Sequence, residues 1–257
     1  MNSPEQPEHE IAGHQSTALQ VSPRSVARLL IVVALLLALA HLVFAVNYHY
    51  VELDFPGATF LYVLFDLMGE ITIPTWYASS LLLICALLLG AIARITQRQD
   101  GSFVRHWYGL SVILLLLSID EAADIHGAVS YKLQNLFGLD GALSYPWVIP
   151  GALFTIVVAV TYLPFLAHLP SETRRQVLLA GGLFVSGALG MEIIEAAYDA
   201  AFSYRAPYLV MVAIEETLEM AGAIMLLYAF LSYSGWLARG FTVVIAGPRA
   251  NGPQPQR

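Results

Sequence analysis

Charged side chains are scarce in this sequence, and so is cysteine. Only 12% of the 257 residues are Asp, Glu, Lys or Arg, whereas a soluble globular chain has about 25%. The single cysteine, Cys85, excludes an intramolecular disulfide and a thiolate metal cluster. A basic patch with interleaved aromatic residues is also lacking, so nothing supports nucleic-acid binding. Hydrophobic residues, in contrast, make up 58% of the chain, which is a composition typical of an integral membrane protein.

Six apolar stretches are long enough to cross a bilayer, which takes about 20 mostly apolar residues. They are residues 26–46, 74–95, a stretch that starts near 105 and runs into 114–126, then 147–166, 176–197 and 207–233. We therefore expect an all-α fold, a polytopic bundle of about six transmembrane helices over residues 26–235. The flanking segments, 1–25 and 236–257, are polar and rich in Pro, Gln and Gly, and we expect them to be disordered tails.

The basic residues predict how these spans are oriented, because Lys and Arg are enriched in cytoplasmic loops. If both termini are cytoplasmic, most of the basic residues fall on that side: Arg24, Arg28, Arg94, Arg98, Arg105, Arg174, Arg175, Arg239, Arg249 and Arg257. Only Lys132 and Arg205 fall outside. The tryptophans lie at span ends, where aromatic belts form: Trp76 and Trp147 outside, Trp107 and Trp236 inside. We expect a multi-pass protein of a cell membrane, of the cytoplasmic-membrane type.

Acidic residues concentrate toward the outer ends of three predicted spans. The third, fifth and sixth spans contribute Asp120, Glu121, Asp124, Glu192, Glu195, Asp199, Glu215, Glu216 and Glu219. Helical spacing places the acids of each span in a stripe, as with Glu192, Glu195 and Asp199 at positions i, i+3 and i+7. Glu219 lies about 18 Å along the helix from Pro207, at a rise of 1.5 Å per residue, which is near the middle of the bilayer.

A carboxylate at the centre of a span costs roughly 2.5–3.5 kcal/mol, so these acids should face a shared polar cavity rather than lipid. Like charges repel strongly in a low dielectric, so either some carboxyls hold protons or a cation binds among them. Asp66 and Glu70 precede the second span at the same outer level. His126 points away from the acids in an ideal helix, and it joins them only if the helix contains a π-bulge or has already ended. Solvated helix ends and an inert hydrogen-bonded network are the alternatives without function.

Familiar metal-binding motifs are absent, so a metal site has to be inferred from the acids themselves. The predicted spans contain no Glu-x-x-His pair, no His-Glu-x-x-His and no repeated His-x-x-x-His box. Oxygen ligands with one or two imidazoles suit Fe, Mn or Zn, ahead of Ca or Mg. The predicted metal ligands are Asp120, Glu121, Asp124, His126, Glu192, Glu195, Glu215 and Glu219. The predicted acid/base groups are Glu121, Glu195 and Glu216.

The leading interpretation is a metal-dependent membrane enzyme that acts on a lipid or apolar substrate at an outward-facing acidic pocket. A transporter or channel for cations or protons is the alternative, in which the stripes form a path. The inner halves of the spans carry few ionisable groups, which favours a one-sided site. A haem bound by His41 and His126 ranks lower, as does a subunit without chemistry. Membrane lipids are the expected partners, and the oligomeric state stays open.

Small residues predict where the fifth span packs closely on a neighbour. Gly182, Ser186 and Gly190 recur at every fourth position, a spacing that lets helices approach in lipid. Gly222, beside Glu219, predicts a similar contact on the sixth span.

Overall fold

The structure is a bundle of helices. The computed structural model describes residues 22–53, 55–138, 143–202 and 206–237, and every regular element within them is helical, as the sequence predicts. The elements are α1 (Pro23–Val46), η1 (Asn47–Val51), α2 (Ala58–Phe65), α3 (Ile73–Arg98), α4 (Val104–Ala123), α5 (Ile125–Phe137), α6 (Val148–His168), α7 (Ser171–Val185), η3 (Ser186–Met191), α8 (Glu192–Phe202) and α9 (Ala206–Leu237). The predicted tails lie almost wholly outside the described residues.

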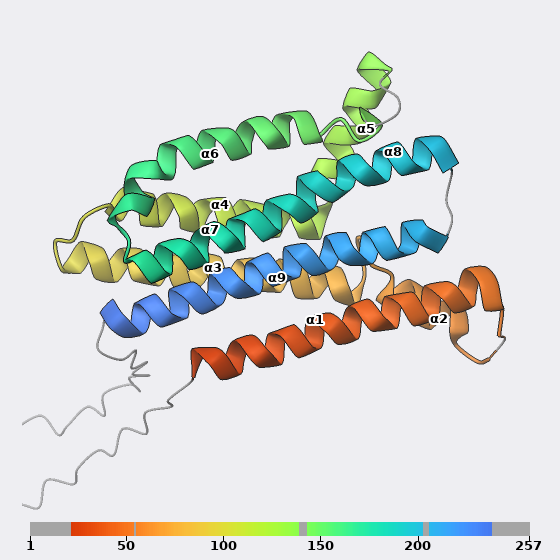
Figure 1. Cartoon of the computed structure of the whole chain (residues 1–257), viewed down its shortest axis with the longest axis horizontal. Coiled ribbons are helices and arrows are strands. Elements are labelled where there is room, and N and C mark those ends of the chain that lie inside the picture. Colours follow the sequence, from red (N-terminus) through yellow and green to blue (C-terminus); the bar gives the residue numbers. More distant parts are fainter. Residues whose placement is uncertain (1–21, 54, 139–142, 203–205, 238–257) are drawn as a thin grey trace, which may run out of the picture.

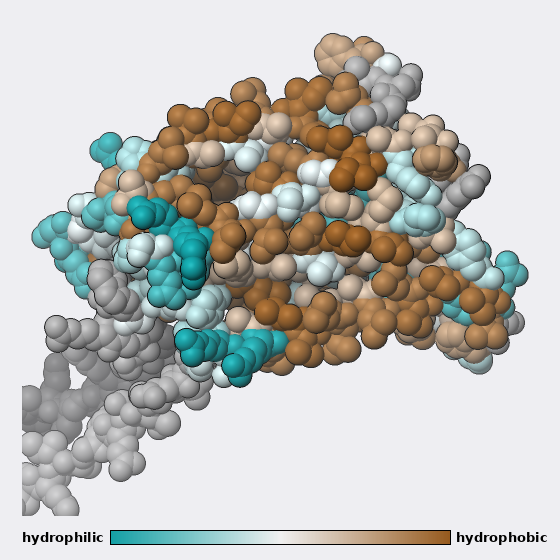
Figure 2. All heavy atoms as spheres, viewed as in Figure 1, coloured by the Kyte–Doolittle hydropathy of each residue, from teal (hydrophilic) through white to brown (hydrophobic). Residues whose placement is uncertain are grey.

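Four helical segments are long and apolar enough to cross a membrane: Pro23–Val51, Ile73–Arg98, Val148–His168 and Ser171–Phe202. Figure 1 shows these rods alongside α4 and α9, with the connecting loops gathered at the two ends of the bundle. In Figure 2 a broad hydrophobic band separates two more hydrophilic ends. Together these features indicate a helical membrane protein.

The N-terminal helix illustrates why the band is apolar. Pro23 occupies the first turn of α1, where its missing N–H costs nothing, and a run without internal Gly or Pro continues the helix. One face is buried and packs against α9; it consists of Ala34, Leu37, His41 and Ala45. The other faces expose large apolar side chains: Leu29, Val32, Leu35, Leu36, Leu39 and Val43. A helix with so wide an exposed apolar surface suits lipid rather than water.

Helix α3 lies at the centre of the bundle, packed against α4 and α9. Its core residues Leu81, Leu89 and Ile92 are at most 1% exposed. Two serines join α3 to α4, since Ser79 Oγ donates to the carbonyl oxygen of Ser118 at 2.8 Å and Ser118 Oγ donates to that of Ser79 at 2.8 Å. This reciprocal pair aligns the two helices toward the end of the bundle that carries α5, which we call the α5 end.

Gly222 sets the crossing of α7 with α9, as the sequence predicts. A Cβ atom at Gly222 would lie 2.7 Å from the backbone nitrogen of Phe184 and 2.8 Å from the carbonyl oxygen of Ala180. Only a residue without a side chain permits this approach of two backbones.

The predicted small-residue stripe on the fifth span is wrong. A Cβ at Gly182 would meet nothing within 4 Å, and one at Gly190 would meet only Ser186 of its own helix. The glycine of this span that packs against α9 is Gly187, whose added Cβ would lie 2.7 Å from Glu219 Cγ. Gly187 and Gly190 lie within the π-helical turn η3, whose wider turn departs from a period of four, whereas Gly182 lies before it in α7.

Candidate functional site

Nine acidic side chains and one histidine line one pocket of about 370 Å³ at the α5 end of the bundle. They are Glu70, Asp120, Glu121, Asp124, His126, Glu192, Glu195, Glu215, Glu216 and Glu219. Every predicted metal ligand and acid/base group is among them, so the stripes of α4, α8 and α9 converge. Among the described residues that line the pocket there is no Lys or Arg. The chemical roles of these residues stay predictions.

His126 enters the pocket because α4 ends immediately before Asp124. That residue adopts the left-handed conformation, with φ of 48°, and its carboxylate accepts a hydrogen bond from the N–H of Gly127 at 3.0 Å, which caps α5. The backbone N–H of His126 donates to Asp120 Oδ1 at 2.8 Å. Of the two conditions under which His126 was expected to join the acids, the ended helix is the one observed.

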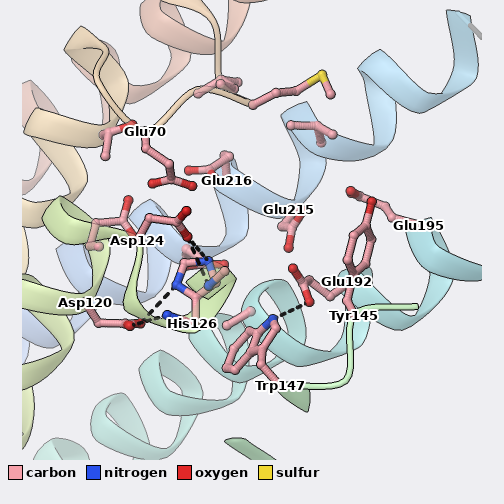
Figure 3. Close-up of a pocket in the computed structure, with 18 of the residues that line it drawn as sticks. Glu70, Asp120, Asp124, His126, Tyr145, Trp147, Glu192, Glu195, Glu215 and Glu216 are labelled. Carbon is pink, nitrogen blue, oxygen red and sulfur yellow. Dashed lines mark hydrogen bonds and ion pairs between the residues drawn. The ribbon is translucent and has the colours of Figure 1, made fainter. Parts of the chain in front are cut away.

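Three side chains that meet near this turn could hold a metal ion. Glu70, Asp124 and His126 each offer a ligand atom, and these atoms lie within 4.8 Å of one another. His126 Nε2 is 3.9 Å from Asp124 Oδ1, whereas Nδ1 is 3.1 Å from Asp120 Oδ2 (Figure 3). Because Asp120 engages Nδ1, Nε2 is the nitrogen left for a ligand. We call Glu70, Asp120, Asp124 and His126 the histidine group.

The electrostatics of the histidine group follow from its burial and its excess of acids. Burial raises the pKa of the Glu70 carboxyl, and the charge of Asp124 adds to this effect. Burial alone would lower the pKa of His126, but its hydrogen bond to Asp120 and the charges of Asp120, Glu70 and Glu192 raise it to about 9. Among the described lining residues, the imidazole is thus the only cationic group beside several carboxyls.

Glu70 is the member of the histidine group that the predicted ligand set lacks. It lies between α2 and α3, in a segment without helical periodicity, so its sequence position does not fix the direction of its side chain. The available signal was its place just before the second span, level with the other acids.

The opposite side of the pocket carries a second cluster, Glu192, Glu195 and Glu215, which we call the glutamate group (Figure 3). The indole N–H of Trp147 donates to Glu192 Oε2 at 2.5 Å. Glu195 is only 3% exposed and lies within hydrogen-bonding range of Glu215. Its Oε1 atom is buried without a hydrogen-bond partner. A buried carboxylate oxygen without a partner at a cavity wall calls for an explanation, such as a bound water, ion or ligand atom.

Three aromatic side chains border the glutamate group, and their presence there was not predicted. Tyr145 and Tyr208 place their hydroxyl oxygens 3.2 Å apart, and the ring of Trp147 lies 5.0 Å from that of His126. Trp147 was expected only as part of an interfacial belt. The seven-residue spacing of Tyr208 and Glu215 on one helix was the signal for their shared face.

Other candidate residues lie outside this pocket. Asp199, the third member of its stripe, is exposed on α8. The ring of His41 is buried in α1, where Nδ1 accepts a hydrogen bond from the N–H of Leu67 at 3.0 Å and lies 3.3 Å from Asp66 Oδ1. The described pocket lining includes His126 but not His41, so the structure does not bring the two predicted haem ligands to one cavity.

Comparison with curated proteins and with solved structures finds no match to this chain. One family model, described as "Domain of unknown function (DUF8692)", matches residues 29–234. The matched segment contains every residue that lines the acidic pocket. Since it covers most of the sequence, the chain belongs to the DUF8692 family.

Proposed function

We propose that this protein is a metal-dependent integral-membrane enzyme whose metal ion binds at the histidine group. The observation that carries the proposal is the approach of ligand atoms from Glu70, Asp124 and His126 to within 4.8 Å. Asp120 supports it, because a carboxylate behind a metal-bound histidine holds the ring and fixes its tautomer. Two carboxylates and one imidazole suit Zn, Mn or Fe.

The remaining acids of the pocket then serve other purposes than metal binding. The predicted ligands Glu121, Glu192, Glu195, Glu215 and Glu219 lie outside the three-residue set, so we restrict metal binding to the histidine group. Figure 3 shows Glu216 next to Glu70. A metal ion at this place would make bound water more acidic, and Glu216 is the carboxyl positioned to take or return the proton. The substrate class is a lipid or another apolar molecule that reaches the pocket within the bilayer.

We also propose six spans, with α4 and α9 added to the four apolar segments. Helix α4 packs on α3, and α9 packs on α1, α3 and α7, so both share the bundle of the apolar helices. The described arginines then lie at the end opposite α5: Arg24, Arg28, Arg94, Arg98, Arg105, Arg174 and Arg175. The positive-inside rule makes that end cytoplasmic, together with both termini.

Reporter fusions test this topology. Fusions after Asp100 and Glu172 should report the cytoplasm, because both positions follow basic span ends. A fusion after Asp140, which lies outside the described residues, should report the external side. A cytoplasmic signal at Asp140 would contradict the six-span arrangement.

A cation- or proton-linked carrier is the second candidate, because a path also needs intramembrane acids. The neighbouring cavity, however, which extends from the acidic pocket toward the opposite end of the bundle, has mostly apolar lining. A path for cations or protons would require polar groups in that cavity. A metal site that opens to one side of the membrane is therefore better supported than a carrier.

Elemental analysis of detergent-purified protein tests the metal centre. Protein from cells supplied with Zn, Mn and Fe should contain about one metal ion per chain, and Asp124→Asn and His126→Ala should lose it because each removes a ligand. Asp120→Asn should keep the fold but weaken metal affinity about 10–100-fold. The matched control is Asp199→Asn, which changes an exposed carboxylate outside the pocket and should retain wild-type metal content. Equal metal content in His126→Ala and wild type would contradict the proposal.

A further inference from the structure

A second cavity, of about 450 Å³, lies between α6 and the helices α4 and α7. Its lining follows α6 from Trp147 to Leu166, roughly 28 Å at 1.5 Å per residue. Thr155 and the hydroxyl of Tyr162 are the main polar groups among otherwise apolar lining residues. A long cavity with such walls, at bilayer depth, is suited to a hydrocarbon chain and not to water.

Aromatic side chains close the end of this apolar cavity that lies away from α5. The ring of Phe165 lies 4.7 Å from that of Trp107 and 5.7 Å from that of Tyr162. The Tyr162 hydroxyl donates to the carbonyl oxygen of His106 at 3.1 Å, which fixes the ring. A chain in the cavity therefore ends at this floor and has its other end near the acidic pocket.

The apolar cavity and the acidic pocket share a wall. Leu117, Trp147, Phe184 and Ala188 line both of them. These four side chains are the wall at which the two cavities adjoin. A molecule that places a hydrocarbon chain along α6 would have its polar head next to the acidic pocket, on the side where Trp147 contacts the glutamate group.

The charge of the pocket selects the kind of head group. A divalent ion at the histidine group would offset the acids nearest to it, but Glu195 and Glu215 lie toward the opposite side of the pocket (Figure 3). Glu195 and Glu215 lie within hydrogen-bonding range of each other, which two ionised carboxylates do only with a proton or a cation between them. The buried Oε1 of Glu195 has no partner. The rings of Trp147 and Tyr145 nearby favour a cation further.

We propose that the two cavities together bind a single-chain amphiphile with an ammonium head, its tail along α6 and its head among Glu192, Glu195 and Glu215. The shape of the apolar cavity, the shared wall and the unpartnered acid carry this inference. It names the substrate class of the proposed enzyme and rests on the proposed function for the reaction, whereas binding itself requires no metal.

Binding measurements with three head groups on one chain length test the proposal. Wild-type protein in a neutral maltoside detergent, treated with a chelator, is titrated with hexadecylamine, hexadecanol and hexadecanoic acid. The amine should bind roughly tenfold or more tightly than the alcohol, and the acid more weakly still, because only the ammonium pairs with the buried carboxylates. Equal affinity for the amine and the alcohol would overturn the assignment of the head group and indicate protonated glutamates.

Two variants with matched controls locate the ligand. Gly182→Leu adds a side chain where nothing lies within 4 Å in the apolar cavity, and Glu195→Gln removes the unpartnered charge; each should weaken amine binding roughly tenfold. Gly235→Leu, also in open space but outside both linings, and Asp199→Asn should bind as wild type does. Unchanged amine affinity in Gly182→Leu would place the tail elsewhere. The head-group comparison uses wild-type protein and decides the question even if a variant fails to fold.

The outcomes separate this inference from the metal centre. Amine selectivity in a protein that never contains metal would refute the metal centre and leave the amphiphile site standing. A metal-loaded protein without amine selectivity would do the reverse.

Discussion

Gly222→Ala should destabilise the protein by opening the crossing of α7 and α9. The added Cβ would lie 2.7 Å from the backbone nitrogen of Phe184 and 2.8 Å from the carbonyl oxygen of Ala180. Backbone atoms cannot rotate away as a side chain does, so the helices must separate. Overpacking of this kind costs about 1–3 kcal/mol, and the better helix propensity of alanine returns about 0.5–1 kcal/mol. We expect a net loss of about 1–2 kcal/mol, or a fall in Tm of about 2–8 °C for a chain of this size.

The single cysteine supplies the assay. Cys85 is 0% exposed, so a thiol-reactive fluorophore should label it only as the protein unfolds on heating. Gly182→Ala is the control, because its Cβ meets nothing within 4 Å and the change should be neutral or stabilising. The close contact of α7 and α9 would be refuted if Gly222→Ala were as stable as wild type, or if Gly222→Ala and Gly182→Ala lost equal thermal stability.

Three further predictions concern stability. Burial acts to raise the pKa of Asp66, but its contact with the His41 ring and a hydrogen bond from the N–H of Met68 lower it below its usual range. The ionised Asp66 carboxylate therefore contributes to the free energy of unfolding above its unfolded-state pKa, and this contribution is lost as pH falls through its folded-state pKa. Asp66→Asn should cost about 1–2 kcal/mol at neutral pH and nothing in strong acid, as a measurement of Tm against pH would show. Ser79→Ala and Ser118→Ala should each cost about 0.6–1.7 kcal/mol in thermal unfolding, and the double variant less than their sum, because the two hydroxyls serve one contact between helices. Chelation should lower the Tm of wild-type protein, by an amount equivalent to about 2.7 kcal/mol if the metal had stood at a hundred times its Kd; an unchanged Tm with metal removed would contradict a structural contribution of the ion.

The acidic pocket could be predicted because intramembrane carboxylates are costly in lipid. Helical spacing indicates which acids share a face of a helix. The free-energy cost of a carboxylate within the bilayer indicates that faces such as those of Glu192 and Glu219 turn toward the interior of the bundle. The convergence of three helices in the structure agrees with that reasoning. Asp199 departs from it because it lies nearer the end of α8, where exposure removes the penalty.

The position of His126 could not be predicted, because it depends on the backbone of one residue. Asp124 adopts φ of 48°, a conformation that few non-glycine residues take, and this ends α4 and turns the chain into α5. A helix continued for one more turn would have pointed the imidazole elsewhere. The position of the Glu70 side chain in the pocket could not be predicted for a related reason, since Glu70 lies in a segment without helical periodicity.

The sequence by itself determined the all-helical class, the membrane environment and which side chains would avoid lipid, because each of these depends on local composition and on a 3.6-residue period. Only the tertiary structure decided which acids meet, through the turn at Asp124, the π-helical turn η3 and the contact of Gly187 and Gly222 across α7–η3 and α9. These features rotate a side chain by a fraction of a helical turn, but they leave no mark on the hydropathy pattern of the sequence. The adjacency of an acidic pocket and an apolar cavity at Trp147 is likewise a property of packing, since it depends on where α6 lies relative to α4 and α7 and on no pattern within α6 itself.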